Sequence, residues 1–233
     1  MNKNIESNRT AESLYLILAS VFVASLVSCN LIFQKFFQLD IWLPFIGTYT
    51  FEQSVGLLPY PITFLVTDII SEVYGQKRAN KVVTAGLFAS IFMLIIVTVS
   101  DMTQAASWSP VDNQTFSNVF GLSGAAVFAS MIAYLIAQYI DVRVFHFWKK
   151  LTNGKHLWLR NNASTIFSQF VDTFSVLFLL CLFDVITWDR FSILLLNGFL
   201  FKVFFAAFDT PIAYALIYFI RKKFGLKFGE EIH

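Results

Sequence analysis

Residues 191–220 read FSILLLNGFLFKVFFAAFDTPIAYALIYFI, an apolar run that contains Lys202, Asp209 and Pro211. About 20 apolar residues are enough for a helix to cross the hydrocarbon core of a bilayer. A charged side chain near the centre of such a helix costs roughly 3 kcal/mol or more, so it is normally sheltered inside a bundle. The run therefore predicts a membrane-spanning helix whose charged side chains serve a binding site or a pathway.

Five further apolar stretches precede this one, and together they predict an all-α, polytopic membrane protein built as a six-transmembrane-helix bundle. The chain is 57% hydrophobic and 14% charged, whereas soluble domains are about 25% charged. Its 233 residues leave no room for a sizeable soluble domain beside the bundle. We expect one integral membrane domain over residues 1–233, with spans near residues 14–37, 57–73, 82–100, 122–144, 162–186 and 191–220.

The Lys and Arg residues are distributed unevenly about these spans. Fourteen of the 17 fall in the two tails and in the second and fourth loops. The opposite loops hold only Lys35 and Arg190, and Lys202 lies within a span. Because loops rich in Lys and Arg stay on the cytoplasmic side, both termini are predicted to be cytoplasmic.

The outward segment 38–56 does not fit a span. Residues 41–51 are apolar and aromatic but interrupted by Pro44 and Gly47, and they are too few to cross the bilayer. A re-entrant loop and an interfacial hairpin both remain open, provided that protein shelters the backbone.

Several classes of function are disfavoured. A net charge of +2 indicates no nucleic-acid surface. Cys29 and Cys181 lie inside apolar segments and are interpreted as small hydrophobic residues. No metal-ligand cluster, phosphate loop or nucleophile elbow is present in the sequence, so we expect no metal, no cofactor and no enzymatic activity. An intramembrane enzyme is therefore the weakest of the alternatives.

Four ionisable residues are predicted at mid-bilayer depth on three helices. Asp68 lies on the second span and Asp172 on the fifth, while Lys202 and Asp209 share the sixth. Seven residues of helix place Lys202 about 10 Å from Asp209, which is too far for direct pairing. Lys202 therefore needs a carboxylate on another helix, and Asp172 and Asp68 are the candidates.

A polar stripe on the fifth span strengthens this site. Thr165, Ser168, Asp172 and Ser175 follow the spacing of one helical face, with Gln169 beside them. The hydroxyl groups either face a ligand or bond to carbonyl groups of their own helix.

Asp68 and Glu72 share a face of the second span, with Glu72 nearer the cytoplasmic end. Lys77 and Arg78 follow in the loop. Glu72 has two interpretations. It either forms a salt bridge with one of these cations at the helix end, or it belongs with Arg78 to an inner gate or coupling site.

A seam of small residues on the fourth span favours close helix packing, either inside the bundle or in a homodimer. It comprises Ala126, Ser130, Ala133 and Ala137.

An ordered set of motifs carries a resemblance. Residues 65–75 read LVTDIISEVYG, residues 162–165 read NAST, residues 169–173 read QFVDT, and Lys202 is followed by DTP at 209–211. Together they resemble the bacterial queuosine precursor transporter family, over roughly residues 14–223. The resemblance implies a six-helix importer in the inner (plasma) membrane, carrying 7-deazaguanine bases that feed tRNA modification. It also adds Asn30, which matches a polar position late in the first span of the family.

The candidate substrate-binding residues are therefore Asn30, Asp68, Thr165, Ser168, Gln169, Asp172, Lys202 and Asp209. A carboxylate can accept from the N–H and NH₂ groups of a 7-cyano- or 7-aminomethyl-7-deazaguanine, and Lys can donate to its carbonyl. These groups do not distinguish a deazaguanine from guanine or a pterin. The energy source stays open between proton coupling and facilitated diffusion. An alternative function is a membrane subunit that binds a vitamin-like or nucleobase ligand and needs a separate energising partner.

Overall fold

The computed structural model describes residues 2–44, 47–121, 124–153, 155–184, 186–227 and 230–232, without the side chains of residues 2–7, 43, 124–130, 160 and 161. The described part of the chain forms six long helices and one short helix, with a β-hairpin and a 3₁₀ turn between the first two helices. In chain order they are α1 (Asn2–Ile32), β1 (Phe36–Leu43), β2 (Gly47–Ser54), η1 (Val55–Leu57), α2 (Tyr60–Val73), α3 (Gln76–Asp101), α4 (Asn113–Phe120), α5 (Gly124–Leu151), α6 (Leu157–Leu182) and α7 (Trp188–Phe224).

Each predicted span corresponds to one of the long helices. Within the described residues, five segments are long and apolar enough to cross a membrane, and they lie on α1, on η1 with α2, and on α3, α6 and α7. The predicted fourth span coincides with α5, a helix of 28 residues. The protein is thus a mostly helical, multi-pass membrane protein.

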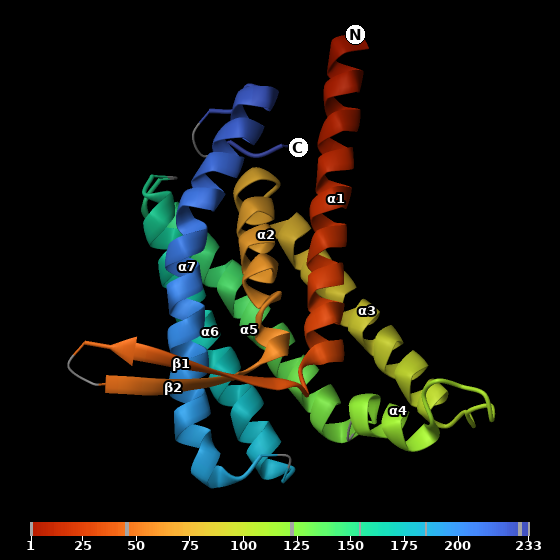
Figure 1. Cartoon of the computed structure of the whole chain (residues 1–233). Coiled ribbons are helices and arrows are strands. Elements are labelled where there is room, and N and C mark those ends of the chain that lie inside the picture. The colour runs from red at the N-terminus through yellow and green to blue at the C-terminus, as the bar shows by residue number, and fades with distance from the viewer. Residues whose placement is uncertain are drawn as a thin grey trace.

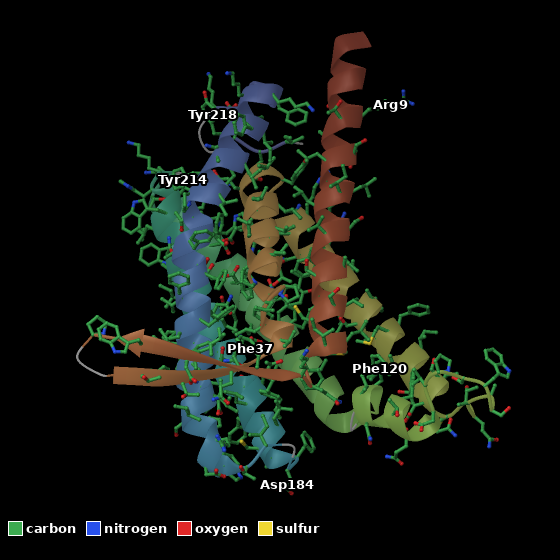
Figure 2. All side chains as sticks on the ribbon, in the orientation of Figure 1. Arg9, Phe37, Phe120, Asp184, Tyr214 and Tyr218 are labelled. Atoms are coloured by element: carbon green, nitrogen blue, oxygen red, sulfur yellow. The ribbon has the colours of Figure 1, made fainter. Side chains whose placement is uncertain are left out.

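The long helices pack into one bundle, and α2 lies between α1 and α7 (Figure 1). Both termini lie at the same end of the bundle, and the hairpin crosses α7 nearer the opposite end (Figure 1). Arg9 and Tyr218 lie toward the first end, and Asp184 lies at the second (Figure 2). We call these the terminal end and the hairpin end.

The distribution of side chains is the reverse of that in a soluble protein. Phe88, Phe204 and Phe219 are each about two-thirds exposed, at 66%, 65% and 65%. Asp68, Asp172 and Lys202 are instead buried, with no more than 4% of each side chain exposed. Because water would reverse this preference, the outer surface suits lipid tails and the interior suits polar chemistry.

The hairpin corrects the prediction of an all-α fold. Strands β1 and β2 pair antiparallel, with Phe36 opposite Ser54 and Leu43 opposite Gly47. The first predicted span also ends early, at Ile32, because the chain turns there into β1. Pairing between the strands satisfies backbone groups that a lone extended segment would leave open beside the bilayer.

Local sequence explains how the hairpin leads into α2. The Ser54 side chain caps η1 by accepting from the Gly56 amide at 3.1 Å. Gly56 packs so closely on α1 that a Cβ atom there would lie 2.6 Å from the Cys29 carbonyl oxygen. Pro61 stands in the first turn of α2, where its missing N–H leaves no bond unmade. The entrance to α2 is therefore held tightly against α1.

Helix α4 lies outside the predicted spans. Asp112 caps it by accepting from the Thr115 amide at 2.7 Å, and this hydrogen bond lowers the pKa of Asp112. In the small-residue seam, Ala133 and Ala137 are buried within the chain. The Ala126 and Ser130 side chains lie outside the described residues, so the homodimer remains a prediction.

Candidate functional site

A cavity lies where α1, α2, α5, α6 and α7 meet the base of the hairpin. It offers about 160 Å³ in which a water-sized molecule can be centred. Most of its wall is apolar, with Leu26, Leu177 and Leu194 among the lining residues. Its polar and aromatic lining consists of Asn30, Phe33, Phe36, Gln53, Ser54, Tyr60, Tyr134, Asp172, Thr173 and Lys202.

An ion pair between two helices forms the charged part of this wall. Lys202 Nζ on α7 lies 2.6 Å from Asp172 Oδ2 on α6. The Tyr60 hydroxyl on α2 donates to the same carboxylate oxygen. Lys202 Nζ also lies 4.2 Å from the centre of the Tyr60 ring, within cation–π range. The predicted partnership of Lys202 with a carboxylate on a neighbouring helix is confirmed, and the partner is Asp172.

The second oxygen of the Asp172 carboxylate differs from the first in its hydrogen bonding. Asp172 Oδ1 is buried and has no hydrogen-bond donor among the described residues. A buried carboxylate oxygen without a donor is unfavourable by about 1–3 kcal/mol or more. Asp172 lines the cavity, and its Oδ1 atom needs a donor that the described residues do not supply.

The hairpin completes the cavity, and α7 holds it in place. Asn197 on α7 is fully buried, donates to the Glu52 carbonyl at 3.2 Å and accepts from the Tyr49 hydroxyl. Arg190 reaches Glu52 Oε2 at 3.2 Å near the surface. The neighbouring Gln53 side chain lines the cavity.

A second, more open hollow lies beside the cavity at the hairpin end. The two share Phe36, Ile186 and Leu194 in their walls. The second hollow also carries Glu52 and Arg190. The cavity and this hollow are therefore neighbours at the hairpin end.

Three of the predicted substrate-binding residues line the cavity: Asn30, Asp172 and Lys202. Asn30 also donates to Ser90 Oγ on α3 at 3.4 Å. Asp209 lies two turns from Lys202 toward the terminal end and is only half-buried. The cavity wall does not include Asp209 or the remaining candidates, which are Asp68, Thr165, Ser168 and Gln169.

A second polar cluster lies one helical turn from Asp172 toward the terminal end. Ser168 donates to Asp141 Oδ1 on α5 at 2.9 Å. The Asp68 and Ser164 side chains are also in hydrogen-bonding contact with the Asp141 carboxyl. Thr165 and Gln169, which flank Ser168 in the sequence, are also buried. Thr165 Oγ1 and Gln169 Oε1 have no hydrogen-bond partner within the described part of the chain.

Ion pairs tie helices together at the terminal end. Glu72 on α2 pairs with Arg221 on α7, and Lys149 on α5 lies 3.8 Å from Glu72 Oε2. Lys149 also contacts Glu231 at 2.8 Å. Glu72 therefore has its ion-pair partners on α5 and α7, whereas the sequence predicted Lys77 or Arg78, just after its own helix, as its partner.

Arg78, the other predicted gate residue, belongs to a separate contact at the same end. Arg78 Nη2 lies 2.6 Å from Glu12 Oε1 on α1. Its guanidinium also packs on the Tyr15 and Tyr74 rings, at 5.1 and 5.4 Å from their centres. Arg78 thus joins α3 to α1 rather than to Glu72.

Several residues of these sites were missed from the sequence. Tyr60, Gln53 and Arg221 lie near helix ends or in the ambiguous outward segment, where polar residues are ordinary. Asp141 gave the clearest available signal, because it is an acidic residue inside the fourth predicted span. Its position near the cytoplasmic end of that span concealed its burial.

Comparison with known families agrees with a transport function. The sequence model of a family described as a putative vitamin uptake transporter matches residues 54–216, more than half of the chain. The chain belongs to this family. The match begins at the base of the hairpin and includes the Asp172–Lys202 pair, and it stops short of Arg221.

Three curated relatives support the same assignment. A probable queuosine precursor transporter of Bacillus subtilis is 26% identical over 163 residues, 70% of each chain. The queuosine precursor transporter of Escherichia coli is 29% identical over 129 residues, 55% of each chain. A probable queuosine precursor transporter of Haemophilus influenzae is 25% identical over 152 residues, which are 64% of this chain and 62% of the relative. The stated resemblance is confirmed, and no solved structure matches this family member.

Proposed function

We propose that the protein imports queuosine precursors, the 7-deazaguanine bases, and binds them in the cavity beside Asp172 and Lys202. The observation that carries this proposal is the buried Asp172–Lys202 pair, which lines the cavity and leaves Asp172 Oδ1 without a donor among the described residues. The names of the three relatives supply the substrate class.

The chemistry of the cavity suits a planar base with donors along one edge. Asp172 Oδ1 would accept from ring N–H and exocyclic NH₂ groups, and Lys202 would donate to the base carbonyl. The Tyr60 and Tyr134 rings, whose centres lie 5.3 Å apart, offer apolar faces next to these groups. Gln53 and Asn30 supply amide groups for the remaining edge.

The cavity adjoins the more open hollow at the hairpin end, so we propose that the structure faces outward. In this proposal one unit crosses the bacterial inner membrane six times, with α5 as the fourth span and both termini in the cytoplasm. The location of both termini at one end of the bundle supports an even number of crossings (Figure 1). The excess of Lys and Arg at that end supports its cytoplasmic placement.

The terminal end would act as the inner gate. Glu72, Arg221 and Lys149 link α2, α7 and α5 there, and the Arg78–Glu12 pair links α3 to α1. Opening toward the cytoplasm would require these pairs to separate while contacts at the hairpin end close. Such alternation around a fixed central site is how many secondary transporters work.

Uptake by the chain alone tests the proposal. A host that cannot make queuosine precursors, but can use them, should gain queuosine-modified tRNA at low external precursor when it expresses the full chain. Asp172→Asn should abolish this gain at equal membrane abundance, and Ser175→Ala should retain it. Absence of modified tRNA despite well-folded protein would reject the substrate assignment. Restoration only by an added energising protein would instead favour the ligand-binding subunit.

A further inference from the structure

The Asp68–Asp141 pair is a site that substrate binding does not explain. Asp68 lies on α2 and Asp141 on α5, with 2% and 0% of each residue exposed. Neither lines the cavity. Ser168 holds Asp141 from α6 at 2.9 Å, and Ser164 is in hydrogen-bonding contact with the same carboxyl.

The carboxyl groups of the two acids lie within hydrogen-bonding reach of each other. An ionised carboxylate can only accept hydrogen bonds, so a bond between two carboxyl groups requires a proton on one of them. Independently, Asp141 Oδ2 is buried and has no hydrogen-bond donor within the described part of the chain. A single proton shared between the two carboxyl groups supplies that missing donor.

The charged neighbours of the pair are largely engaged elsewhere. Glu72, one turn along α2, pairs with Arg221 and Lys149. Asp172, one turn along α6 from Ser168, pairs with Lys202. The packed helices also carry other titratable residues, among them His146 (buried), Arg143 and Lys150 (both exposed) on α5, Lys77, Arg78, Lys81 and Asp101 on α3, and Arg160, whose side chain lies outside the described residues.

We infer that the Asp68–Asp141 pair binds the proton that drives import. In this outward-facing state the pair holds one proton, taken up from the hairpin end. Release of that proton toward the terminal end leaves two adjacent carboxylates, whose repulsion favours a different arrangement of α2, α5 and α6. One proton and one base then move inward per cycle, and no bond in the base changes. The inference rests on the proposed function.

The position of Ser168 links the two sites. It contacts Asp141, and Asp172 follows four residues later on the same helix, facing the cavity. A shift of α6 when the base binds Asp172 therefore reaches the acid pair directly. Coupling through one rigid helix needs no further element between the sites.

Transport by the purified full chain in liposomes separates coupling from binding. Labelled 7-cyano-7-deazaguanine is followed in two assays: exchange without a pH gradient, and accumulation driven by an outside-acid gradient. The wild type should exchange the base in the first and concentrate it above the external level in the second, and a protonophore should abolish the concentration step. If the wild type exchanges the base and its accumulation is unchanged by the protonophore, proton coupling is rejected and the proposed function stands. Failure of exchange in the wild type rejects the proposed function instead.

Asp141→Asn keeps the shape of the side chain but cannot share or release the proton. It should keep exchange and lose accumulation above the external level. Asp189→Asn, at an exposed carboxyl on α7 with 76% of its side chain accessible, is the matched control and should keep both. The inference is overturned if Asp141→Asn accumulates the base as well as the wild type does. It is also overturned if a normally folded Asp141→Asn protein loses both exchange and accumulation.

Infrared spectroscopy detects the bound proton without any transport step. The variant measured is Asp141→Asn, or Asp68→Asn if Asp141→Asn fails to fold. The wild type near neutral pH should show the carbonyl stretch of a protonated carboxylic acid. The Asn variant at the acid pair should lose that band, and Asp189→Asn should retain it. A wild-type spectrum without the band, or a band that survives in the variant, overturns the inference.

Discussion

Lys202 Nζ lies 2.6 Å from Asp172 Oδ2, and this ion pair joins α7 to α6 in the middle of the bundle. Both side chains are almost completely buried. Loss of one partner leaves an uncompensated charge, whereas loss of both leaves a neutral site. The pair therefore connects the stability of the bundle to the chemistry of the cavity, and each partner can be tested separately.

Lys202→Met should destabilise the protein by about 3–5 kcal/mol, because it leaves Asp172 buried and charged. The double variant Lys202→Met with Asp172→Asn should recover most of the thermal stability and none of the transport. Thermal melting of detergent-purified protein and base uptake measure the two effects. A Lys202→Met protein with wild-type melting temperature and wild-type uptake would contradict the role of the pair.

Asp172→Asn should weaken base binding by roughly 10- to 150-fold, the equivalent of about 1.5–3 kcal/mol for a hydrogen bond to a charged group. Ser175→Ala is the matched control on the same helix. Ser175 is half-buried and does not line the cavity, so its affinity should stay near that of the wild type. Calorimetric titration of both variants at equal folded yield decides the matter, and equal affinities would remove Asp172 from the binding site.

Asn197→Ala should detach the base of the hairpin from α7. The change removes the donor to the Glu52 carbonyl and the acceptor for the Tyr49 hydroxyl, and each of these partly buried groups left unsatisfied costs at most about 1–3 kcal/mol. Uptake should fall because the detached hairpin carries Gln53, which lines the cavity. Thr50→Ala removes an exposed hydrogen bond to Asp40 in the same hairpin and should leave uptake unchanged. Proteolysis of the hairpin reports its release, and an Asn197→Ala protein as resistant and active as the wild type would argue against anchoring.

Glu72→Gln should loosen the terminal end, because Arg221 and Lys149 lose their shared carboxylate. A reporter Ser71→Cys, at a position that is fully buried, should then react faster with a maleimide added from the cytoplasmic side. Glu12→Gln breaks the more exposed pair with Arg78 and should change labelling much less, since such pairs contribute about 0–1 kcal/mol. Equal labelling of the wild type and Glu72→Gln would show that these ion pairs do not form a gate.

Periodicity and composition predicted much of this fold. The second and third predicted spans agree closely with the helices, because long apolar runs must form helices wherever lipid offers no hydrogen bonds. The outward segment was harder to interpret, since Pro44 and Gly47 suit a hairpin turn, a re-entrant loop or an interfacial segment equally well. Only its strand pairing, with Gln38 opposite Glu52, and its anchor on α7 decide for a hairpin.

By itself, the sequence determined that charged residues lie within apolar helices and that Lys202 requires a carboxylate on another helix. Those conclusions follow from the free energy of moving a charge into hydrocarbon, which depends on residue type and depth alone. The tertiary structure decided which carboxylate serves Lys202, that Glu72 meets Arg221 across 149 positions, and that Asp68 meets Asp141 instead of the cavity. These pairings depend on the rotation and neighbours of each helix, which are set by side-chain packing over the whole bundle and leave no local signal in the sequence.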